Sequence, residues 1–410
     1  MEKRRVVVTG LGGVTPVGND VETIWSNIKN GISGIGEITK FDTTDYKVKL
    51  AAEVKDFDPE KYLDYKSIKR YDLFSIYAMY ASAQAYEDSG LGEDIDKNRM
   101  ATVYGSGIGG LKTIEDNIVK VHEKGVKRLS PLFIPTSISN MAAGNIAIML
   151  GAKGSCTATT TACAAGTHAV IDGFRVIVDN RADIAIVGGS EAPITPCGIG
   201  GFMNMTALST STDPSRASIP FDKERDGFVA GEGAVTLILE ELEHAKARGA
   251  KIYAEVIGYG STCDAFHITS PDFKGGARCM DEAITTSGLS AVDIDYINAH
   301  GTSTGPNDLN ETLAIKEVFG DDTKVLVSST KSMTGHLLGG AGAIEALICV
   351  KALQDQVAPP TINYKVADEE LDLDYVANSA RDTKLEYVMS NSLGFGGHNA
   401  SVILKRWNNE

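Results

Sequence analysis

Residues 159–169, TTTACAAGTHA, place one cysteine between small residues and the start of an apolar helical pattern. Cys163 would lie at the N-terminus of that helix, where the helix dipole lowers the pKa of a thiol and free backbone N–H groups can bind an oxyanion. This arrangement is typical of a nucleophile. A free cysteine is more often a small buried apolar residue, and Cys163 alone also fits that description. The other five cysteines, at positions 156, 197, 263, 279 and 349, keep this structural interpretation.

Two histidines lie in polar segments further along the chain. His300 is part of NAHGTST (298–304), where a predicted strand opens into a turn, and His336 ends KSMTGH (331–336). Imidazoles at such places can donate hydrogen bonds or exchange protons. They could instead bind a metal together with Cys163, but no third ligand has the local spacing of a metal site. Lys331 is predicted to be a partly buried cation that tunes the pKa values of its neighbours. The remaining histidines, at positions 122, 168, 244, 267 and 398, lack this context and are interpreted as structural or surface residues.

Two glycine-rich loops complete the set. The loop GFGG (394–397) can approach another backbone closely and direct an N–H group at the carbonyl oxygen that the Cys163 N–H would bind. The loop GSGIGG (105–110) matches the dinucleotide pattern G-x-G-x-x-G, which would suggest a nicotinamide oxidoreductase. The expected acid about 20 residues later is absent, because that region is basic. We therefore interpret residues 105–110 as a turn that lines a pocket.

The composition indicates a globular chain. Of its 410 residues, 43% are hydrophobic and 23% charged, which does not favour disorder. A net charge of -15 argues against a nucleic-acid partner. No apolar run reaches the roughly 18 residues of a membrane span, and the N-terminus MEKRR leads into a β-branched segment rather than an export signal. The cysteines form no C-x-x-C pair, which predicts free thiols and a cytoplasmic location.

The elements that must position these residues follow a pattern that occurs twice. In the first part we predict strands at 5–10, 101–104, 183–189 and 231–240, a loop at 10–16, and helices at 21–29, 67–87, 164–178 and 241–248, with a helix start at Asp58. From residue 251 the pattern begins again, with strands at 252–257, 296–299 and 387–394 and helices at 281–287 and 341–353. We predict two βα-rich halves, residues 1–250 with the nucleophile and residues 251–410 with both histidines, that meet at one site.

Four motifs together, TACA (161–164), NAHGTST, KSMTGH and NSLGFGG (391–397), resemble those of the β-ketoacyl-[acyl-carrier-protein] synthases. The resemblance extends over essentially the whole chain, and residues 105–110 and 200–205 look most like synthase II, which acts on medium and long acyl chains. It implies an α/β, thiolase-like fold with two similar halves stacked as a layered α-β-α-β-α sandwich. One departure is His398, where many members carry threonine.

The resemblance implies a decarboxylative Claisen condensation in fatty acid chain elongation, without a cofactor. Cys163 would take the acyl group as a thioester, and the backbone N–H groups of Cys163 and Phe395 would form the oxyanion hole. His300 and His336 would donate hydrogen bonds to the malonyl thioester oxygen as the enolate forms. Lys331 would support the electrostatics. Alternatives are a polyketide-type ketosynthase, its non-catalytic chain-length-factor partner, or a non-decarboxylating thiolase, although Cys163 and His336 speak against the last two.

The family also implies binding residues and partners. Thr302 and Thr304 would hold the pantetheine arm, Ile108 and Phe202 would line the acyl channel, and Phe395 would gate it. A structural monovalent cation is expected near Asn298, Glu345, Ser390 and Asn391. The expected partners are acyl-carrier protein and a second copy of the chain, with no nucleic acid and no membrane.

Acyl-carrier protein is acidic, so the net charge of the chain opposes docking at long range. Local basic clusters can prevail because salt screens distant charges over about 8–10 Å. Such clusters are formed by Lys66, Lys69 and Arg70, and by Lys124, Lys127 and Arg128.

Overall fold

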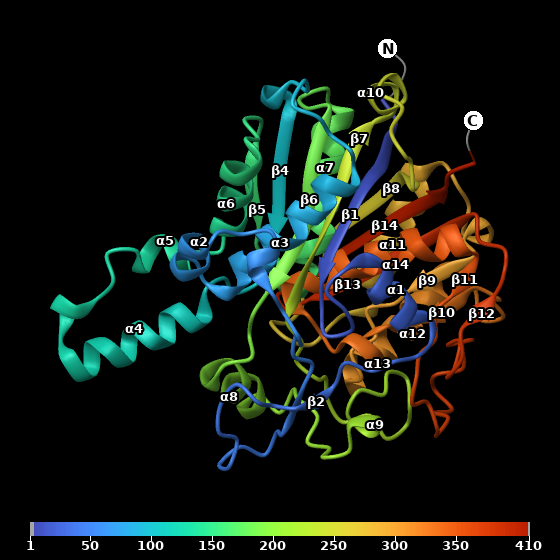
Figure 1. Cartoon of the computed structure of the whole chain (residues 1–410). Coiled ribbons are helices and arrows are strands. Elements are labelled where there is room, and N and C mark those ends of the chain that lie inside the picture. The colour runs from blue at the N-terminus through green and yellow to red at the C-terminus, as the bar shows by residue number, and fades with distance from the viewer. Residues whose placement is uncertain (1–3, 409–410) are drawn as a thin grey trace.

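The computed structural model describes residues 4–408, and its body is one ten-stranded sheet covered by helices (Figure 1). Residues 1–3, the start of the segment that was predicted to lack an export signal, lie outside the described residues. The strand order is β10-β9-β13-β14-β8-β1-β7-β6-β4-β5. Within residues 4–408, no helix combines the length and the apolar character that crossing a membrane requires.

The first half of the sheet comes from the N-terminal part of the chain. Its strands are β1 (Val6–Val14), β7 (Gly233–Glu241), β6 (Ile184–Glu191), β4 (Met100–Gly105) and β5 (Cys156–Thr159). β1 pairs antiparallel with β7, and β7 antiparallel with β6, whereas β6, β4 and β5 are parallel. β5 is the last strand of the sheet, so one of its edges has no partner strand within residues 4–408.

The second half repeats this pattern. Its strands are β8 (Ala254–Cys263), β14 (His398–Arg406), β13 (Tyr387–Gly394), β9 (Tyr296–Asn298) and β10 (Leu326–Ser328). β8, β14 and β13 alternate in direction, and β13, β9 and β10 are parallel. β1 and β8 pair antiparallel and join the halves. The division into domains at residues 1–250 and 251–410 stays a prediction.

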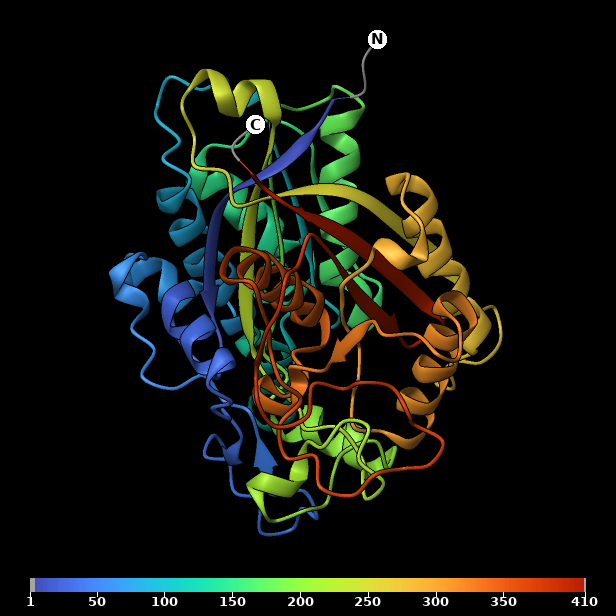
Figure 2. The same cartoon turned by 90° about the vertical axis from the view of Figure 1, so that its right-hand side faces the viewer.

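Helices form three of the five layers. The central layer consists of α7 (Ala165–Val178) and α14 (Ala341–Asp355), which contact each other and strands of both halves. α14 is buried nearly all round, as its apolar sequence requires. α3 (Leu73–Asp88) and α6 (Met141–Leu150) cover the outer face of the first half. α11 (Phe273–Ser287) and α12 (Gly305–Phe319) cover that of the second (Figure 2). The predicted α-β-α-β-α layering is confirmed.

Further helices, turns and ribbons lie outside these layers. The remaining helices are α1 (Val21–Lys29), α2 (Tyr65–Arg70), α4 (Leu111–Lys124), α5 (Phe133–Ser137), α8 (Pro196–Asn204), α9 (Pro214–Ala217), α10 (Leu242–Ala247) and α13 (Lys331–Thr334). The 3-10 turns are η1 (Pro59–Lys61), η2 (Lys97–Arg99), η3 (Val126–Arg128), η4 (Ala162–Ala164), η5 (Ala291–Asp293) and η6 (Leu338–Gly340). Two small ribbons pair β2 (Gly36–Glu37) with β3 (Leu50–Ala51) and β11 (Val357–Ala358) with β12 (Arg381–Asp382).

The N-terminal strand is longer than predicted. Residues 10–14 were expected to belong to a loop, yet β1 continues to Val14 after an irregularity in its pairing with β7 between Val8 and Gly10. The glycines serve packing rather than a turn. A Cβ at Gly10 would lie 2.3 Å from the Ala85 carbonyl oxygen, and α3 can therefore lie directly on the strand.

The long helix predicted at 67–87 is two helices, α2 and α3. The helical conformation is interrupted at Asp72. Its carboxylate accepts hydrogen bonds from the N–H groups of Phe74 (3.2 Å) and Thr113 (2.9 Å). This carboxylate starts α3 and ties it to α4. Asp58 does cap the turn that follows it, but that turn is only the 3-10 segment η1.

Candidate active site

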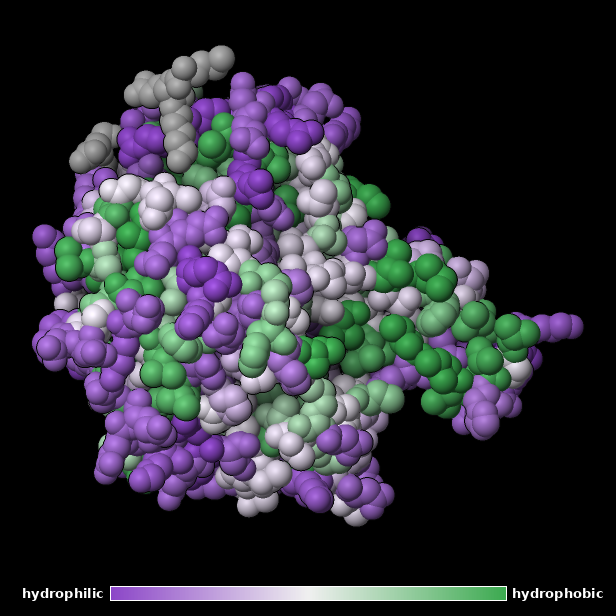
Figure 3. Space-filling view, turned by 180° about the vertical axis from the view of Figure 1, so that it is seen from behind, coloured by the Kyte–Doolittle hydropathy of each residue, from purple (hydrophilic) through white to green (hydrophobic). Residues whose placement is uncertain are grey.

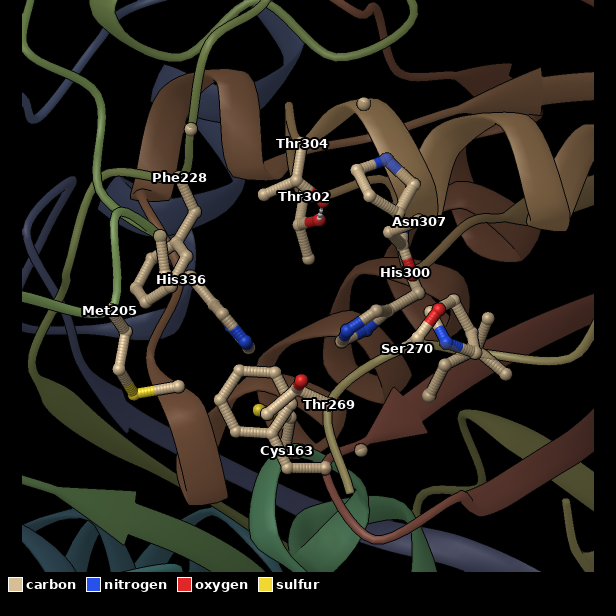
Figure 4. A pocket seen from close by; sticks show the side chains of 18 of the residues that line it. Cys163, Met205, Phe228, Thr269, Ser270, His300, Thr302, Thr304, Asn307 and His336 are labelled. Carbon is tan, nitrogen blue, oxygen red and sulfur yellow. Dashed lines mark hydrogen bonds between the residues drawn. The ribbon is translucent and has the colours of Figure 1, made fainter. Parts of the chain in front are cut away.

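A cavity of about 330 Å³ is lined by residues from both halves of the chain. Cys163 reaches it from the first half, and His300, His336 and Phe395 reach it from the second. Figure 4 shows both imidazoles pointing from opposite sides into the space beside the Cys163 sulfur. The structure thus brings together the residues that the sequence singled out in separate motifs.

Cys163 lies in turn η4, immediately before α7. Its side chain is buried, and burial raises the pKa of its thiol to about 12, while the Lys331 charge and a hydrogen bond from the Phe395 backbone N–H lower it. The predicted lowering of this pKa is therefore wrong for the resting site, because loss of solvation outweighs the favourable groups. Ala162, just before the cysteine, has a left-handed φ of 50°, a costly conformation that orients the sulfur.

The loop after β13 lies directly on the nucleophile turn. A Cβ at Gly394 would be 2.8 Å from the Thr161 oxygen and 3.2 Å from the Cys163 nitrogen, so only glycine allows this approach. The approach places the backbone N–H of Phe395 on the Cys163 sulfur. Two backbone N–H groups, those of Cys163 and Phe395, are consequently close to one reacting position.

His300 and His336 form an edge-to-face pair with ring centroids 5.2 Å apart and an interplanar angle of 85°. Burial first, and then the Lys331 charge, lower both pKa values well below 6.5. Both imidazoles are therefore neutral at neutral pH. Within residues 4–408, neither Nδ1 atom has a hydrogen-bond partner. Each neutral ring carries one N–H, which can be directed at an oxygen in the cavity.

Lys331 begins α13 and is only 2% exposed, so it is fully buried rather than partly buried as predicted. Its ammonium group forms an ion pair with Glu345 of α14. Burial raises the pKa of Glu345 to about 7, and the Lys331 charge opposes this rise. The Lys331 charge lowers the pKa of both histidines and of Cys163, which is the direction that a tuning role requires.

A buried carboxylate that the sequence analysis did not identify holds the His300 loop. The backbone N–H groups of His300 and Gly301 donate to the two oxygens of Glu311 on α12, each at 2.7 Å. Burial raises the pKa of Glu311 to about 7. The sequence signal that could have identified Glu311 is its position on the buried face of the helix that follows the His300 turn.

A second such carboxylate explains the glycine loop at 105–110. The N–H groups of Gly107 and Ile108 donate to Glu191, at 2.7 and 3.1 Å. These are the groups that would have to bind a pyrophosphate in a dinucleotide site. The loop is therefore already occupied by a carboxylate of the chain, which removes the structural basis for an oxidoreductase.

The predicted substrate-binding residues divide into two groups. Phe202, Thr302 and Thr304 line the cavity, and the two threonine hydroxyls are hydrogen-bonded at 2.9 Å. Ile108 does not line the cavity. It packs instead against the apolar cluster that contains Cys163, beside Phe202. This cluster extends from the sulfur into the N-terminal half.

Unpartnered polar atoms mark the predicted cation position. Asn298 on β9 lies opposite Ser390 on β13, and Glu345 belongs to α14, which packs on β13. Both side-chain polar atoms of Asn298, Oγ of Ser390 and Oε2 of Glu345 are buried without a hydrogen-bond partner in the described part of the chain. Asn391 differs, because its amide contacts Ser401 and Met280. The first three residues fit a cation with oxygen ligands.

The predicted docking clusters are exposed. Lys66, Lys69 and Arg70 lie on α2, and Lys127 and Arg128 lie on η3, next to Lys124 at the end of α4. Thr136 of α5 donates to the Arg70 carbonyl oxygen at 3.3 Å, which connects α2 to the segment that carries the second cluster.

A buried cysteine with a backbone N–H on its sulfur, facing two neutral imidazoles across a duplicated α/β fold, defines an acyl-transferring condensing enzyme. Comparison with protein families agrees. Residues 3–245 match the model of the beta-ketoacyl synthase N-terminal domain, and residues 253–365 match that of the C-terminal domain. The chain belongs to the β-ketoacyl synthase family.

Relatives of known sequence and structure narrow the comparison. The chain is 50% identical to the 3-oxoacyl-[acyl-carrier-protein] synthase 2 of Synechocystis and to that of Coxiella burnetii, and each alignment covers 99% of both chains. Among solved structures it is similar to the ishigamide ketosynthase/chain length factor, with 36% identity and a TM-score of 0.95 over 99% of this chain and 100% of the other. It is also similar to a type II polyketide ketosynthase in complex with its acyl-carrier protein, with 36% identity, a TM-score of 0.91 and the same coverage.

Proposed function

We propose that the chain catalyses the condensation of an acyl thioester with malonyl-acyl-carrier protein, which gives 3-oxoacyl-acyl-carrier protein and CO2 in fatty acid elongation. The observation that carries this proposal is the convergence of Cys163, His300 and His336 on one cavity. The 50% identity to 3-oxoacyl-[acyl-carrier-protein] synthases 2, against 36% to the polyketide ketosynthase, favours fatty acid over polyketide synthesis. A chain-length-factor role is disfavoured, because the nucleophile is present.

In the first half-reaction the Cys163 sulfur attacks the thioester carbonyl. The Cys163–acyl bond forms, the bond to the pantetheine sulfur breaks, and the thiol proton ends on the departing pantetheine thiol. The N–H groups of Cys163 and Phe395 stabilise the oxyanion. Because burial keeps the resting thiol neutral, its proton must leave as the attack proceeds.

In the second half-reaction the malonyl group loses CO2, and the electron pair of the broken bond forms an enolate. The N–H groups of His300 and His336 donate to the enolate oxygen, which requires neutral rings and fits their lowered pKa values. The enolate carbon attacks the acyl carbonyl, and the Cys163 thiolate leaves and takes up a proton. No strong base is needed, because decarboxylation replaces proton abstraction.

The other predicted residues surround this chemistry. Thr302 and Thr304 bind the pantetheine arm from the cavity wall, Phe202 and Ile108 bound the acyl chain, and Phe395 gates the channel. A monovalent cation at Asn298, Ser390 and Glu345 would fix these side chains beside the Lys331 ion pair. Replacing K⁺ and Na⁺ by tetramethylammonium should then lower the melting temperature of the wild type but not of Asn298→Leu, and equal melting temperatures of the wild type in both solutions would refute the site.

Acyl-carrier protein is the proposed partner, with docking through Lys66, Lys69 and Arg70 and through Lys127 and Arg128. A type II ketosynthase of 36% identity forms such a complex. We place the chain in the cytoplasm, in keeping with six free cysteines.

The proposed homodimer rests on two surfaces. β5 has a free edge, and the segment from α4 to α5 extends from the body as an arm (Figure 1). Figure 3 shows apolar side chains gathered on this arm. Its exposed apolar residues are Ile118, Val119, Val126, Leu132, Ile134 and Ile138. Sedimentation analysis should show a dimer, and replacing Ile118 and Ile134 by aspartate should weaken it. A wild-type monomer would refute this proposal.

Intact-protein mass spectrometry after incubation with acyl-carrier protein tests the proposed chemistry. We expect one acyl adduct on Cys163 that is absent from Cys163→Ala, and release of CO2 when malonyl-acyl-carrier protein is added. The absence of an adduct on the wild type would overturn the proposal.

A further inference from the structure

Glu191, at the end of β6, is a completely buried carboxylate to which the proposed chemistry assigns no part. Oε1 accepts hydrogen bonds from the Ser106 hydroxyl (3.0 Å) and from the N–H groups of Ile108 (3.1 Å) and Gly109 (3.3 Å). Oε2 accepts from the N–H groups of Gly107 (2.7 Å) and Gly339 (3.0 Å). All five groups donate hydrogen bonds to the Glu191 carboxylate.

This set of donors requires an ionised group. Four backbone N–H groups and one hydroxyl compensate the charge of Glu191. Burial raises the pKa of Glu191, and the hydrogen bonds from Gly107 and Ile108 lower it. A neutral amide of the same shape would present an NH₂ group to backbone N–H donors, and one side of the network would lose its acceptor.

The two segments that Glu191 joins both contribute to the apolar cluster around Cys163. The Ser106–Gly109 side carries Ile108, which packs on the apolar cluster around Cys163. Gly339 belongs to turn η6, whose first residue, Leu338, lines the cavity three residues before α14 begins. The segments approach so closely that a Cβ at Gly339 would lie 2.4 Å from the Gly107 nitrogen. The carboxylate therefore sets the spacing between Ile108 and Leu338.

We infer that Glu191 is a positioning residue that fixes the acyl end of the cavity and thereby determines which acyl chains Cys163 accepts. It acts through the backbone of the Ile108 loop and of η6 and does not touch the reacting atoms. Its charge also raises the pKa of the Cys163 thiol, an effect that is the same for every acyl chain. The inference rests on the proposed function, since it concerns the acyl group carried by Cys163. His300, Thr302 and Thr304 lie outside this network, and the backbone of His336 is held separately by hydrogen bonds with Val229 and Gly231. We therefore expect the malonyl half-reaction to keep its geometry.

The test compares Glu191→Gln with a matched control, Glu240→Gln. Glu240 is equally buried and lies on the neighbouring strand β7, but its partners are Arg248, Thr9 and His244, and it does not line the cavity. The rate of acyl-Cys163 formation is measured by mass spectrometry with octanoyl-, dodecanoyl- and hexadecanoyl-carrier protein. Decarboxylation of malonyl-carrier protein is measured in parallel.

We expect Glu191→Gln to change the ratio of hexadecanoyl to octanoyl transfer by about tenfold or more, the discrimination that small changes in an apolar pocket produce. Malonyl decarboxylation should stay within about twofold of wild type, and Glu240→Gln should keep the wild-type chain-length ratio. An equal loss for all chain lengths, or an unchanged ratio, would overturn the inference. If Glu191→Gln does not fold, Ser106→Ala provides the test. It removes one hydrogen-bond donor to Oε1 of Glu191 and leaves the hydrogen bond from the Gly339 N–H to Oε2. It should change the ratio in the same direction, and an unchanged ratio would again refute the role.

This result is separable from failure of the proposed function. If the wild type forms no acyl adduct, the function itself is wrong. If the wild type forms the adduct and the variants keep its chain-length ratio, only the role of Glu191 is wrong.

Discussion

Turn η4 in the N-terminal half and turn η6 in the C-terminal half occupy corresponding places before the two central helices, α7 and α14. Each begins with a non-glycine residue in the left-handed region, Ala162 with φ 50° and Leu338 with φ 47°. The second residue differs. It is Cys163 in one turn, with its sulfur directed into the cavity, and Gly339 in the other, with its N–H bound to a carboxylate. The same backbone conformation therefore presents a nucleophile in η4 and a packing contact in η6.

The strands that end beside these turns differ in a complementary way. β6 and β13 hold equivalent positions in their halves, and their last residues are Glu191 and Gly394. Glu191 accepts an N–H from η6, whereas the absence of a side chain at Gly394 lets the Phe395 N–H reach the sulfur of η4. At equivalent strand ends, a carboxylate joins two loops in one half, and the absence of a side chain allows a close backbone approach in the other.

The largest expected effect separates chemistry from packing in the two turns. Cys163→Ala should lower condensation by at least about 10³-fold, because the nucleophile is lost, with little change in melting temperature. Gly339→Ala should instead lower the stability of the protein while the nucleophile stays in place. Its Cβ would lie 2.4 Å from the Gly107 nitrogen, so the melting temperature should fall by several degrees. Steady-state assays and thermal scans of both variants measure this, and a Gly339→Ala protein as stable as wild type would break the comparison.

The next effect concerns the loop after β13. Gly394→Ala should slow acyl transfer by about 10²-fold, the usual effect of losing one oxyanion-hole donor, because the new Cβ would force the Phe395 N–H away from the sulfur. Single-turnover acylation followed by mass spectrometry measures it. The control is Gly36→Ala, where nothing lies within 4 Å of the added Cβ. Equal acylation rates for both variants would show that the close approach at Gly394 has no catalytic role.

The pH dependence of alkylation sharpens the account of η4. Because the pKa of Cys163 is raised to about 12, the thiolate fraction should grow about tenfold per pH unit from pH 7 to pH 10. The rate of Cys163 modification by iodoacetamide should grow in proportion, with Cys163→Ala as the control for the other thiols. A plateau below pH 8 would indicate that the helix N-terminus outweighs burial after all.

The smallest expected effect concerns docking of the carrier protein on the surface. Both predicted docking clusters belong to the N-terminal half. Reversal of Lys66, Lys69 and Arg70 to glutamate should raise KM for carrier-linked substrates by about tenfold at low salt and leave small thioester analogues unaffected. Lys246→Glu on α10 is the control. An equal change for both substrate types would argue against docking at α2.

Motifs predicted which residues meet in the cavity, because each motif combines a chemical group with local backbone demands. Cys163, His300 and His336 stand at ends of elements that a duplicated fold brings together, and the central helices are readable from their apolar patterns. The pKa of Cys163 was mispredicted because burial is a sum over the whole tertiary structure, whereas the helix N-terminus is local.

Other features could not be read locally. Gly10 indicated a turn, yet it is required by the close packing of α3 on β1. Glu191 looks like any other acid in a chain with 54 acidic residues, and only the fold shows that backbone N–H groups from distant loops converge on it. The interruption at Asp72 depends likewise on Thr113, a partner far away in sequence.

The pairing of β1 with β8 has a consequence for symmetry. Val6 is opposite Val256 and Val8 is opposite Ala254, so the first and third residues of each strand exchange partners. Such reciprocity is the mark of an isologous contact about a two-fold axis. The two halves of the sheet are thus related by an approximate two-fold axis that passes beside Val7 and Glu255. Because Gly339 stands where Cys163 stands in the other half, the symmetry of the backbone is not matched by the chemistry, and the described residues hold one nucleophile that both halves surround.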